Sequence, residues 1–140
     1  MKENTENCIF CKLVRGEIPY VKIWEDDEFL AILDNQPNTE GQTLVITKEH
    51  YDSYVFDMPK VAYKNFMLAT KRVAKLIEKG LGVKRIALVM EGMGVNHAHN
   101  KLYPIYKEEE GQLSTQLGEK KTGEELKIVA DKIKGAFEYG

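Results

Sequence analysis

Five segments of the chain have apolar patterns that predict β-strands. Residues 21–25 alternate apolar and polar side chains, and Asp26-Asp27 can form a turn toward a second apolar segment over 28–33. Together they predict a hairpin, because successive side chains of a strand point to opposite faces. Three further strands are predicted over 42–47, 85–90 and 95–103.

Two longer segments repeat apolar residues at helical spacing. The first begins with Pro59 at the first helical position, ends at Gly80 and should bury Phe66, Thr70, Val73 and Ile77. The second opens with Thr122 and Glu125 at capping-box spacing. Its predicted buried face is formed by Leu126, Val129, Ala130, Ile133 and Phe137. The charged residues 107–123 that precede it predict an exposed loop.

The order of these elements indicates an α+β fold. Strands come mostly in neighbouring runs, with one long central helix inserted and a C-terminal helix appended. This order favours a mainly antiparallel, five-stranded sheet over a doubly wound α/β fold. A length of 140 residues predicts a single domain over 1–140.

Composition narrows the classes of partner and compartment. A net charge of -2 gives no electrostatic footprint for duplex nucleic acid, but a small anionic ligand is compatible with it. No apolar run approaches the ~18 residues of a membrane span, and the N-terminal residues lack a hydrophobic signal core. We therefore expect a cytoplasmic protein without membrane contact. Its two cysteines should then be reduced, which favours a metal or redox role over a disulfide.

The segment 94–104 has the most informative chemistry. His97, His99 and Lys101 occupy alternate positions of a predicted strand, so their side chains should share one face. The preceding run Glu91-Gly92-Met93-Gly94 would let backbone N–H groups approach an oxyanion. Two imidazoles, a cation and a glycine loop suit phosphoryl or nucleotidyl chemistry. The alternative is a solvated strand face with surface histidines.

Cys8 and Cys11 form a CxxC pair, which can chelate a soft metal because both thiolates lie on one tight turn. A redox pair or two small buried side chains remain alternatives. His50 follows the third predicted strand, and two cysteines with three histidines are compatible with a Cys2His2 zinc site. Asp34, at the end of the second strand, suits either ribose hydroxyls or a simple turn.

Three segments, in order, resemble the histidine-triad (HIT) family of nucleotide hydrolases and transferases, in particular its zinc-containing, phosphoramidase-like bacterial branch. These segments are 8–19, 29–50 and 94–104. The resemblance implies a HIT-like fold, a nucleotide substrate and a homodimer.

The resemblance also implies a reaction centred on His99. As the second histidine of the family motif, His99 would attack the α-phosphorus of a nucleoside phosphoramidate or dinucleoside polyphosphate. Water would then hydrolyse the nucleotidyl-histidine intermediate. Backbone donors near Gly94 would stabilise developing charge, and Lys101 would contact the phosphate.

The remaining implied roles concern zinc and nucleotide binding. The resemblance implies a structural zinc ion with four protein ligands, which are Cys8, Cys11, His50 and His97. Asp34 would bind the ribose hydroxyls. The base pocket would include Ile18, Ile32 and Leu33.

The chain departs from the family pattern at two positions of the motif. Lys101 stands where the family has its third histidine, and Asn100 is polar where the family usually has an apolar residue. A lysine keeps positive charge but is a poor proton shuttle at neutral pH. Two alternatives therefore stay open: a nucleotide-binding regulatory or scaffold module with little or no catalysis, and a zinc redox or metal-buffer protein.

Overall fold

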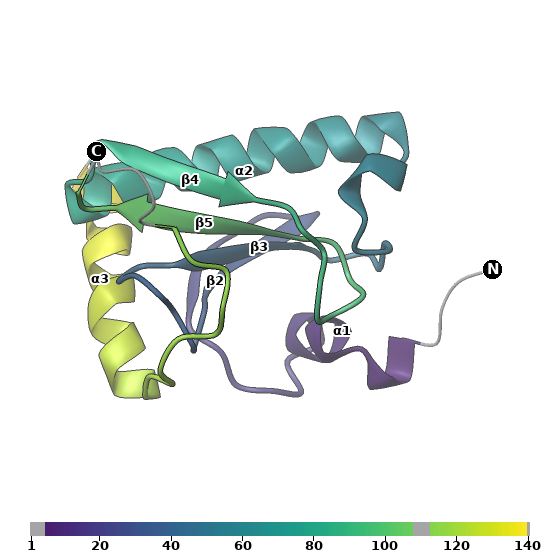
Figure 1. The fold of residues 1–140 in the computed structure, drawn as a ribbon, viewed down its shortest axis with the longest axis horizontal. Coiled ribbons are helices and arrows are strands. Elements are labelled where there is room, and N and C mark those ends of the chain that lie inside the picture. The colour runs from purple at the N-terminus through teal and green to yellow at the C-terminus, as the bar shows by residue number, and fades with distance from the viewer. Residues whose placement is uncertain (1–4, 108–112, 140) are drawn as a thin grey trace.

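The computed structural model describes residues 5–107 and 113–139 and contains the predicted five-stranded sheet (Figure 1). Its strands are β1 (Lys22–Glu25), β2 (Phe29–Leu33), β3 (Thr43–Thr47), β4 (Arg85–Val89) and β5 (His99–Ile105). They lie in the order β1-β2-β3-β5-β4, and every neighbouring pair is antiparallel. The α+β prediction is therefore confirmed. Strand β5 lies between β3 and β4, both of which precede it in the sequence.

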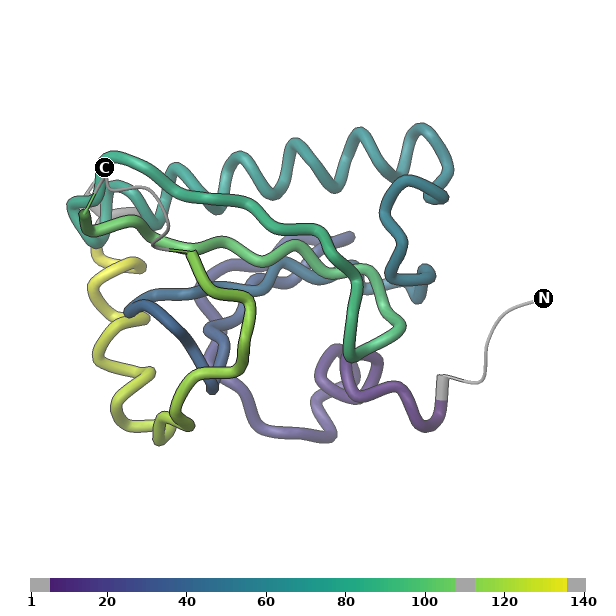
Figure 2. Tube along the Cα trace, in the orientation of Figure 1, coloured from purple at the N-terminus to yellow at the C-terminus, as the bar shows by residue number. Residues whose placement is uncertain are grey.

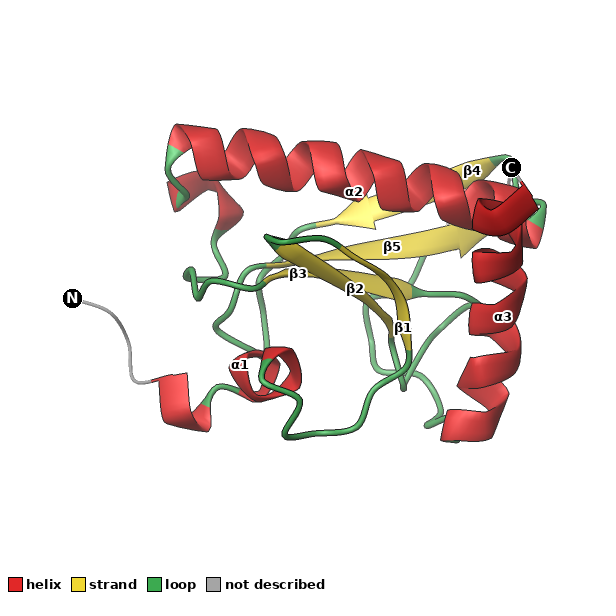
Figure 3. Cartoon of the chain, turned by 180° about the vertical axis from the view of Figure 1, so that it is seen from behind, coloured by secondary structure: helices red, strands yellow, loops and turns green. Residues whose placement is uncertain are grey.

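The described residues form three α-helices, which pack around the sheet: α1 (Ile9–Val14), α2 (Lys60–Leu81) and α3 (Gly123–Tyr139). Short 3-10 turns lie at Thr5–Asn7 and Val55–Asp57. Figures 1 and 3 show α2 running along one face of the sheet, α3 standing across one end, and α1 beneath the opposite face. Helix α1 is not predicted from the sequence, because six residues are too few to show a helical repeat clearly.

Alternate residues of the central strands face two separate cores. Phe29, Ala31 and Leu33 of β2 pack with α2 and α3, whereas Leu30 and Ile32 pack with Phe10 and Leu13 of α1. All five residues of β2 and all five of β3 are buried. The two central strands thus have protein on both faces, which explains their continuous apolar sequences.

The prediction that Gly80 ends the long helix is wrong. Helix α2 continues through Leu81 and ends at Gly82, whose φ of 68° is left-handed. Gly80 instead permits close packing: a Cβ atom there would lie 2.5 Å from the Cα of Ile133 on α3. The helix begins at Lys60, so Pro59 is the N-cap residue and does not occupy the first helical position, where it was predicted.

The C-terminal helix agrees with its capping prediction. The Thr122 N–H donates to Glu125 Oε1 and the Glu125 N–H donates to Thr122 Oγ1, both at 3.1 Å. The predicted buried residues Leu126, Val129, Ala130 and Ile133 all lie in the core. The side chain of Phe137 lies outside the described residues.

The segment predicted as an exposed loop is tied to the body of the protein where it is described. Residues 113–122 are irregular, and the N–H groups of Gly118 and Lys121 donate to the carbonyls of Gln36 and Asn35. Residues 108–112 of this loop lie outside the described part of the chain. Over the described residues, every helix is too short or too polar to cross a lipid bilayer.

The fifth strand differs from its prediction. It begins at His99 and extends to Ile105, so His97 precedes the strand. The cause is a change of partner just before it: Ala98 N–H donates to the carbonyl of Tyr51, and His97 N–H to that of Val95. His97, His99 and Lys101 therefore do not form one row along a regular strand.

Candidate active site and metal centre

Four sulfur and nitrogen ligand atoms converge between α1, the residues after β3 and the loop before β5. They belong to Cys8, Cys11, His50 and His97, and all lie within 4.8 Å of one another. Figures 1 and 2 show that the loop between β4 and β5 reaches α1. This contact brings His97 to Cys8, which are 89 residues apart in the sequence. The structure therefore assembles the whole ligand set expected from the resemblance.

The spacing fits tetrahedral zinc. With Zn–S near 2.3 Å and Zn–N near 2.0–2.1 Å, tetrahedral sulfur and nitrogen ligands lie about 3.5 Å apart. His97 Nδ1 lies 3.2 Å from Cys8 Sγ and 3.4 Å from Cys11 Sγ. His50 Nδ1 lies 3.3 Å from Cys11 Sγ. Four protein ligands would complete the coordination of such an ion, as in structural zinc sites.

Hydrogen bonds set His97 in the form that a metal requires. Its Nε2 lies 2.6 Å from the carbonyl oxygen of Thr47, which can only accept, so Nε2 carries the proton. The Nδ1 lone pair is then directed at the sulfur atoms. Burial also lowers the pKa of His97 to about 4, which keeps the ring neutral. A second ring nitrogen fixed by a carbonyl is the usual support of a metal-binding histidine.

The two thiols differ in their surroundings. Cys8 is the N-cap of α1, and its sulfur accepts from the Cys11 N–H at 3.3 Å. Burial, and then the neighbouring Cys8, raise the pKa of Cys11 to about 11. A bound cation would offset the raised pKa of Cys11, because coordination deprotonates a thiol.

His99 lies beside this cluster but faces a different environment. Its Nδ1 lies 2.7 Å from the carbonyl oxygen of His97, so Nδ1 donates and Nε2 keeps its lone pair. The side chain is buried, and the Phe10 ring meets it edge-on at 5.1 Å between centroids. Burial, assisted by the charge of Lys101, lowers the pKa of His99. A neutral imidazole with a fixed free nitrogen is chemically a nucleophile or a base.

Lys101 follows His99 on the same face of β5. Its cross-strand partner is Leu44, and that of His99 is Ile46; both partners belong to the apolar cluster under α1. The ammonium group pairs with Glu91 at 3.0 Å. Sequence reasoning did not single out Glu91, whose role depends on the path of the loop after β4.

The expected base-pocket residues separate in the structure. Ile18 and Ile32 both pack in the apolar cluster with Phe10, on the face of His99. Leu33 points to the other face and packs in the core with α2 and α3. Adjacent residues of a strand cannot share a face, so Leu33 does not join the other two.

Gly94 lies on the open side of this region. Its φ is 87°, a left-handed conformation, and a Cβ built there would have no atom within 4 Å. The conformation favours glycine, while the space above it is free for a ligand. This placement is compatible with the expected backbone contact.

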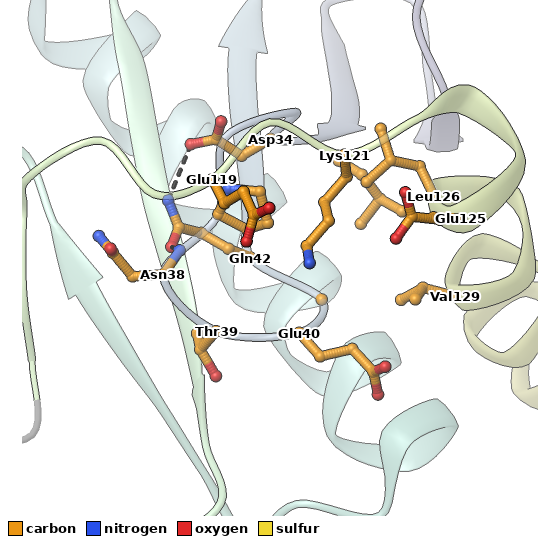
Figure 4. Close-up of a pocket in the computed structure, with 13 residues that line it drawn as sticks. Asp34, Asn38, Thr39, Glu40, Gln42, Glu119, Lys121, Glu125, Leu126 and Val129 are labelled. Atoms are coloured by element: carbon orange, nitrogen blue, oxygen red, sulfur yellow. Dashed lines mark hydrogen bonds between the residues drawn. The ribbon is translucent and has the colours of Figure 1, made fainter.

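Asp34 is held in a fixed orientation at the end of β2. Its Oδ1 accepts from the Gln36 N–H at 2.9 Å, and its Oδ2 accepts from Gln42 Nε2 at 2.8 Å, the dashed line in Figure 4. Gln42 in turn accepts from the Asn38 N–H. This network was not predicted, although a glutamine next to a buried strand was a visible signal.

Asp34 also lines a cavity of about 350 Å³ between the turn at 37–42, the segment at 119–121 and α3 (Figure 4). Neither His99 nor Lys101 is among the described residues that line this cavity. Asp34 is thus part of both this cavity and the hydrogen-bond network with Gln36 and Gln42.

The fold is an α+β antiparallel sheet that carries a buried, hydrogen-bonded histidine beside a Cys2His2 cluster. The HIT domain model matches residues 15–108, which is more than half of the 140-residue chain. The chain therefore belongs to the HIT family. The match begins after Cys11, so the CxxC pair lies outside it.

Individual relatives agree with this assignment. An uncharacterised HIT-like protein of Methanocaldococcus jannaschii is 37% identical over 133 residues, covering 91% of this chain and 99% of that protein. An adenosine 5'-monophosphoramidase of Schizosaccharomyces pombe is 34% identical over 106 residues, covering 75% of this chain and 79% of that protein. A zinc-bound histidine triad family protein of Mycobacterium smegmatis has a TM-score of 0.74 and 27% identity, covering 97% of this chain and 96% of that chain.

Proposed function

We propose that the protein is a nucleotide hydrolase or nucleotidyl transferase that uses His99 as its nucleophile. The observation that carries the proposal is the orientation of His99, whose Nδ1 donates to the His97 carbonyl at 2.7 Å and leaves Nε2 free. The substrate would be a nucleoside phosphoramidate or a dinucleoside polyphosphate. The S. pombe relative is named as an adenosine 5'-monophosphoramidase, which supports the first class.

The proposed reaction has two displacements. His99 Nε2 attacks the α-phosphorus, an N–P bond forms, and the bond from phosphorus to the leaving group breaks. Water then attacks the same phosphorus, releases the nucleoside monophosphate and regenerates the imidazole. Covalent catalysis of this type divides one difficult substitution into two easier steps.

The other residues would bind and orient the nucleotide. Lys101 would place its positive charge on a phosphate oxygen, as lysine commonly does. Asp34 would accept hydrogen bonds from the ribose hydroxyls, and Ile18 and Ile32 would contact the base. Backbone N–H groups near Gly94 would stabilise the charge that develops on phosphorus.

We also propose that Cys8, Cys11, His50 and His97 hold a structural zinc ion. The support is the donor set itself, with its 3.2–3.4 Å contacts and the protonated His97 Nε2. The metal would join α1 to the loop that carries His97 and would supply no catalytic group. The homodimer implied by the resemblance stays a prediction.

The nucleophile is tested by trapping the intermediate. Wild-type protein is mixed with adenosine 5'-phosphoramidate labelled at phosphorus and quenched during turnover. We expect label on the wild-type chain, none on His99→Ala, and a loss of turnover of at least about 10³-fold. An unchanged melting temperature of the variant would show that the fold is intact. Equal label on both proteins would refute the assignment of His99.

The alternative of a nucleotide-binding regulatory or scaffold module makes a different prediction. It requires micromolar affinity for AMP or a related nucleotide, with no hydrolysis across phosphoramidates and dinucleoside polyphosphates. Calorimetric titration and product analysis on the same preparation distinguish the two functions.

A further inference from the structure

The contact between Lys101 and Glu91 is the feature of this site that differs most from the family motif. Lys101 stands at the motif's third histidine position, and its Nζ lies 3.0 Å from Glu91 Oε1. The lysine side chain is only 15% exposed and that of the glutamate 29%. A pair this enclosed is screened less than a surface ion pair.

The backbone delivers Glu91 to this position. Val89, the last residue of β4, is the cross-strand partner of Lys101, so Glu91 lies two residues beyond it toward His99. The turn that follows is anchored: Ser53 Oγ donates to the Gly92 carbonyl at 2.7 Å. Gly92 has a φ of 72°, and a Cβ there would lie 2.7 Å from the Ser53 carbonyl oxygen. The carboxylate is therefore presented from a fixed turn.

A lysine needs such a partner more than a histidine does. Its side chain has four rotatable bonds and loses much rotamer entropy when it is fixed, while imidazole is short and stiff. An unpaired ammonium on this strand would sample several positions, many of them away from His99. Glu91 restricts the ammonium to one of them.

We propose that Glu91 is a positioning residue that holds the Lys101 ammonium beside His99, so that the pair takes the place of the motif's third histidine. The proposal rests on the proposed function. An ammonium group has three N–H donors. One is used by Glu91, and two remain for a phosphate oxygen and the leaving group, so the ion pair persists when the nucleotide binds.

The test is a double-mutant cycle in the full-length protein, with Glu91→Gln and Lys101→Met made singly and together. Glutamine keeps the shape of Glu91 and removes its charge. We expect Glu91→Gln alone to lower kcat/KM on adenosine 5'-phosphoramidate about tenfold, mostly through kcat. With methionine at position 101, the same change should alter kcat/KM by less than about twofold.

Two outcomes would overturn the proposal. Equal losses in both backgrounds would mean that Glu91 acts without Lys101, and no loss in the wild-type background would mean that it does not act. Glu78→Gln is the matched control: it breaks the Lys75–Glu78 pair at 3.2 Å, with a glutamate side chain 26% exposed on α2. It should leave kcat/KM unchanged.

A second measurement separates this proposal from the proposed function. The same four proteins are titrated with AMP, whose phosphate Lys101 should contact, and the dissociation constants should show a coupling of about fivefold. If His99→Ala turns over as fast as wild type but this coupling persists, the catalytic assignment fails and the positioning role stands. Absence of coupling in both turnover and AMP affinity overturns the positioning role.

Discussion

The two faces of the sheet have different tasks, and β5 contributes alternate residues to both. Toward α2, Asn100 and Leu102 are buried beneath the core residues of α2 and α3. Toward α1, His99 and Lys101 lie on a face that is covered by the short helix α1, the residues that follow it and the loop before β5. We therefore expect that substitutions in β5 can change stability and turnover separately, although the residues of the two faces are neighbours in sequence.

Removal of the metal has the largest expected effect. It tests whether the α1 face is stabilised by zinc, whereas the opposite face is stabilised by its apolar core. Cys11→Ser should reduce bound zinc below about a quarter equivalent and lower the free energy of unfolding by about 4 kcal/mol, if free zinc is near 1,000 times its dissociation constant. Elemental analysis and urea denaturation measure both effects. Hydrogen exchange should speed up in α1 and in residues 95–98, and remain slow in α2.

A chelator provides the control for this prediction. It should lower the stability of the wild-type protein to that of Cys11→Ser and leave the variant itself unchanged. Destabilisation of the variant by chelator would place its metal elsewhere.

Gly80→Ala should disturb the opposite face alone. The new Cβ would lie 2.5 Å from the Cα of Ile133 and 3.0 Å from the Lys132 carbonyl oxygen, both backbone atoms. The overpacking outweighs the better helix propensity of alanine, so we expect a loss of about 2 kcal/mol by urea denaturation, with turnover unchanged. Gly135→Ala on α3, with no atom within 4 Å of its Cβ, should instead stabilise by up to about 1 kcal/mol.

Asn100→Leu has the smallest expected effect and tests the comparison most sharply. Asn100 lies between His99 and Lys101 in sequence, but it is fully buried on the helix face, and its Oδ1 has no hydrogen-bond partner. Its Nδ2 donates to Thr70 Oγ1 at 2.9 Å. Leucine removes an unsatisfied polar atom, so we expect a gain of about 1 kcal/mol in thermal unfolding. Turnover should stay within about twofold; a large loss would mean that the faces are coupled.

Most of the fold could be predicted from the sequence because its signals are local. Burial can be predicted from the apolar runs of β2 and β3 and from the helical spacing of Phe66, Val73 and Ile77, all of which are buried in the structure. The capping box at Thr122 likewise involves a partner only three residues away. Such features need no knowledge of distant contacts.

The errors have the opposite origin. The sequence predicts that Gly80 ends the long helix, but this glycine instead permits close packing against Ile133 on another helix, a contact that no local pattern indicates. The sequence predicts that His97 lies on a strand, but its neighbour Ala98 bonds to Tyr51, in the connection after β3, and the strand begins only at His99. The base-pocket role of Leu33 stays a prediction, but its side chain lies on the opposite face of β2 from that of Ile32. In each case a long-range contact or a face of the sheet decides the outcome.

The candidate site shows the same division. The residue types at positions 8, 11, 50 and 97 indicated a metal, but their approach to within 4.8 Å is a property of the fold. Glu91 had no local signal, since nothing near it in sequence indicates that its carboxylate reaches Lys101. Positioning residues on loops are therefore the part of a site that a sequence reveals last.

The strand order has a consequence for synthesis of the chain. Because the order is β1-β2-β3-β5-β4, the last strand to leave the ribosome fills the gap between two strands made earlier. Until Ile105 has emerged, β3 and β4 each lack the neighbouring strand β5. Cys8 likewise cannot meet His97, which is synthesised 89 residues later. The strand that closes the sheet of the nascent chain is also the one that brings His99 into place.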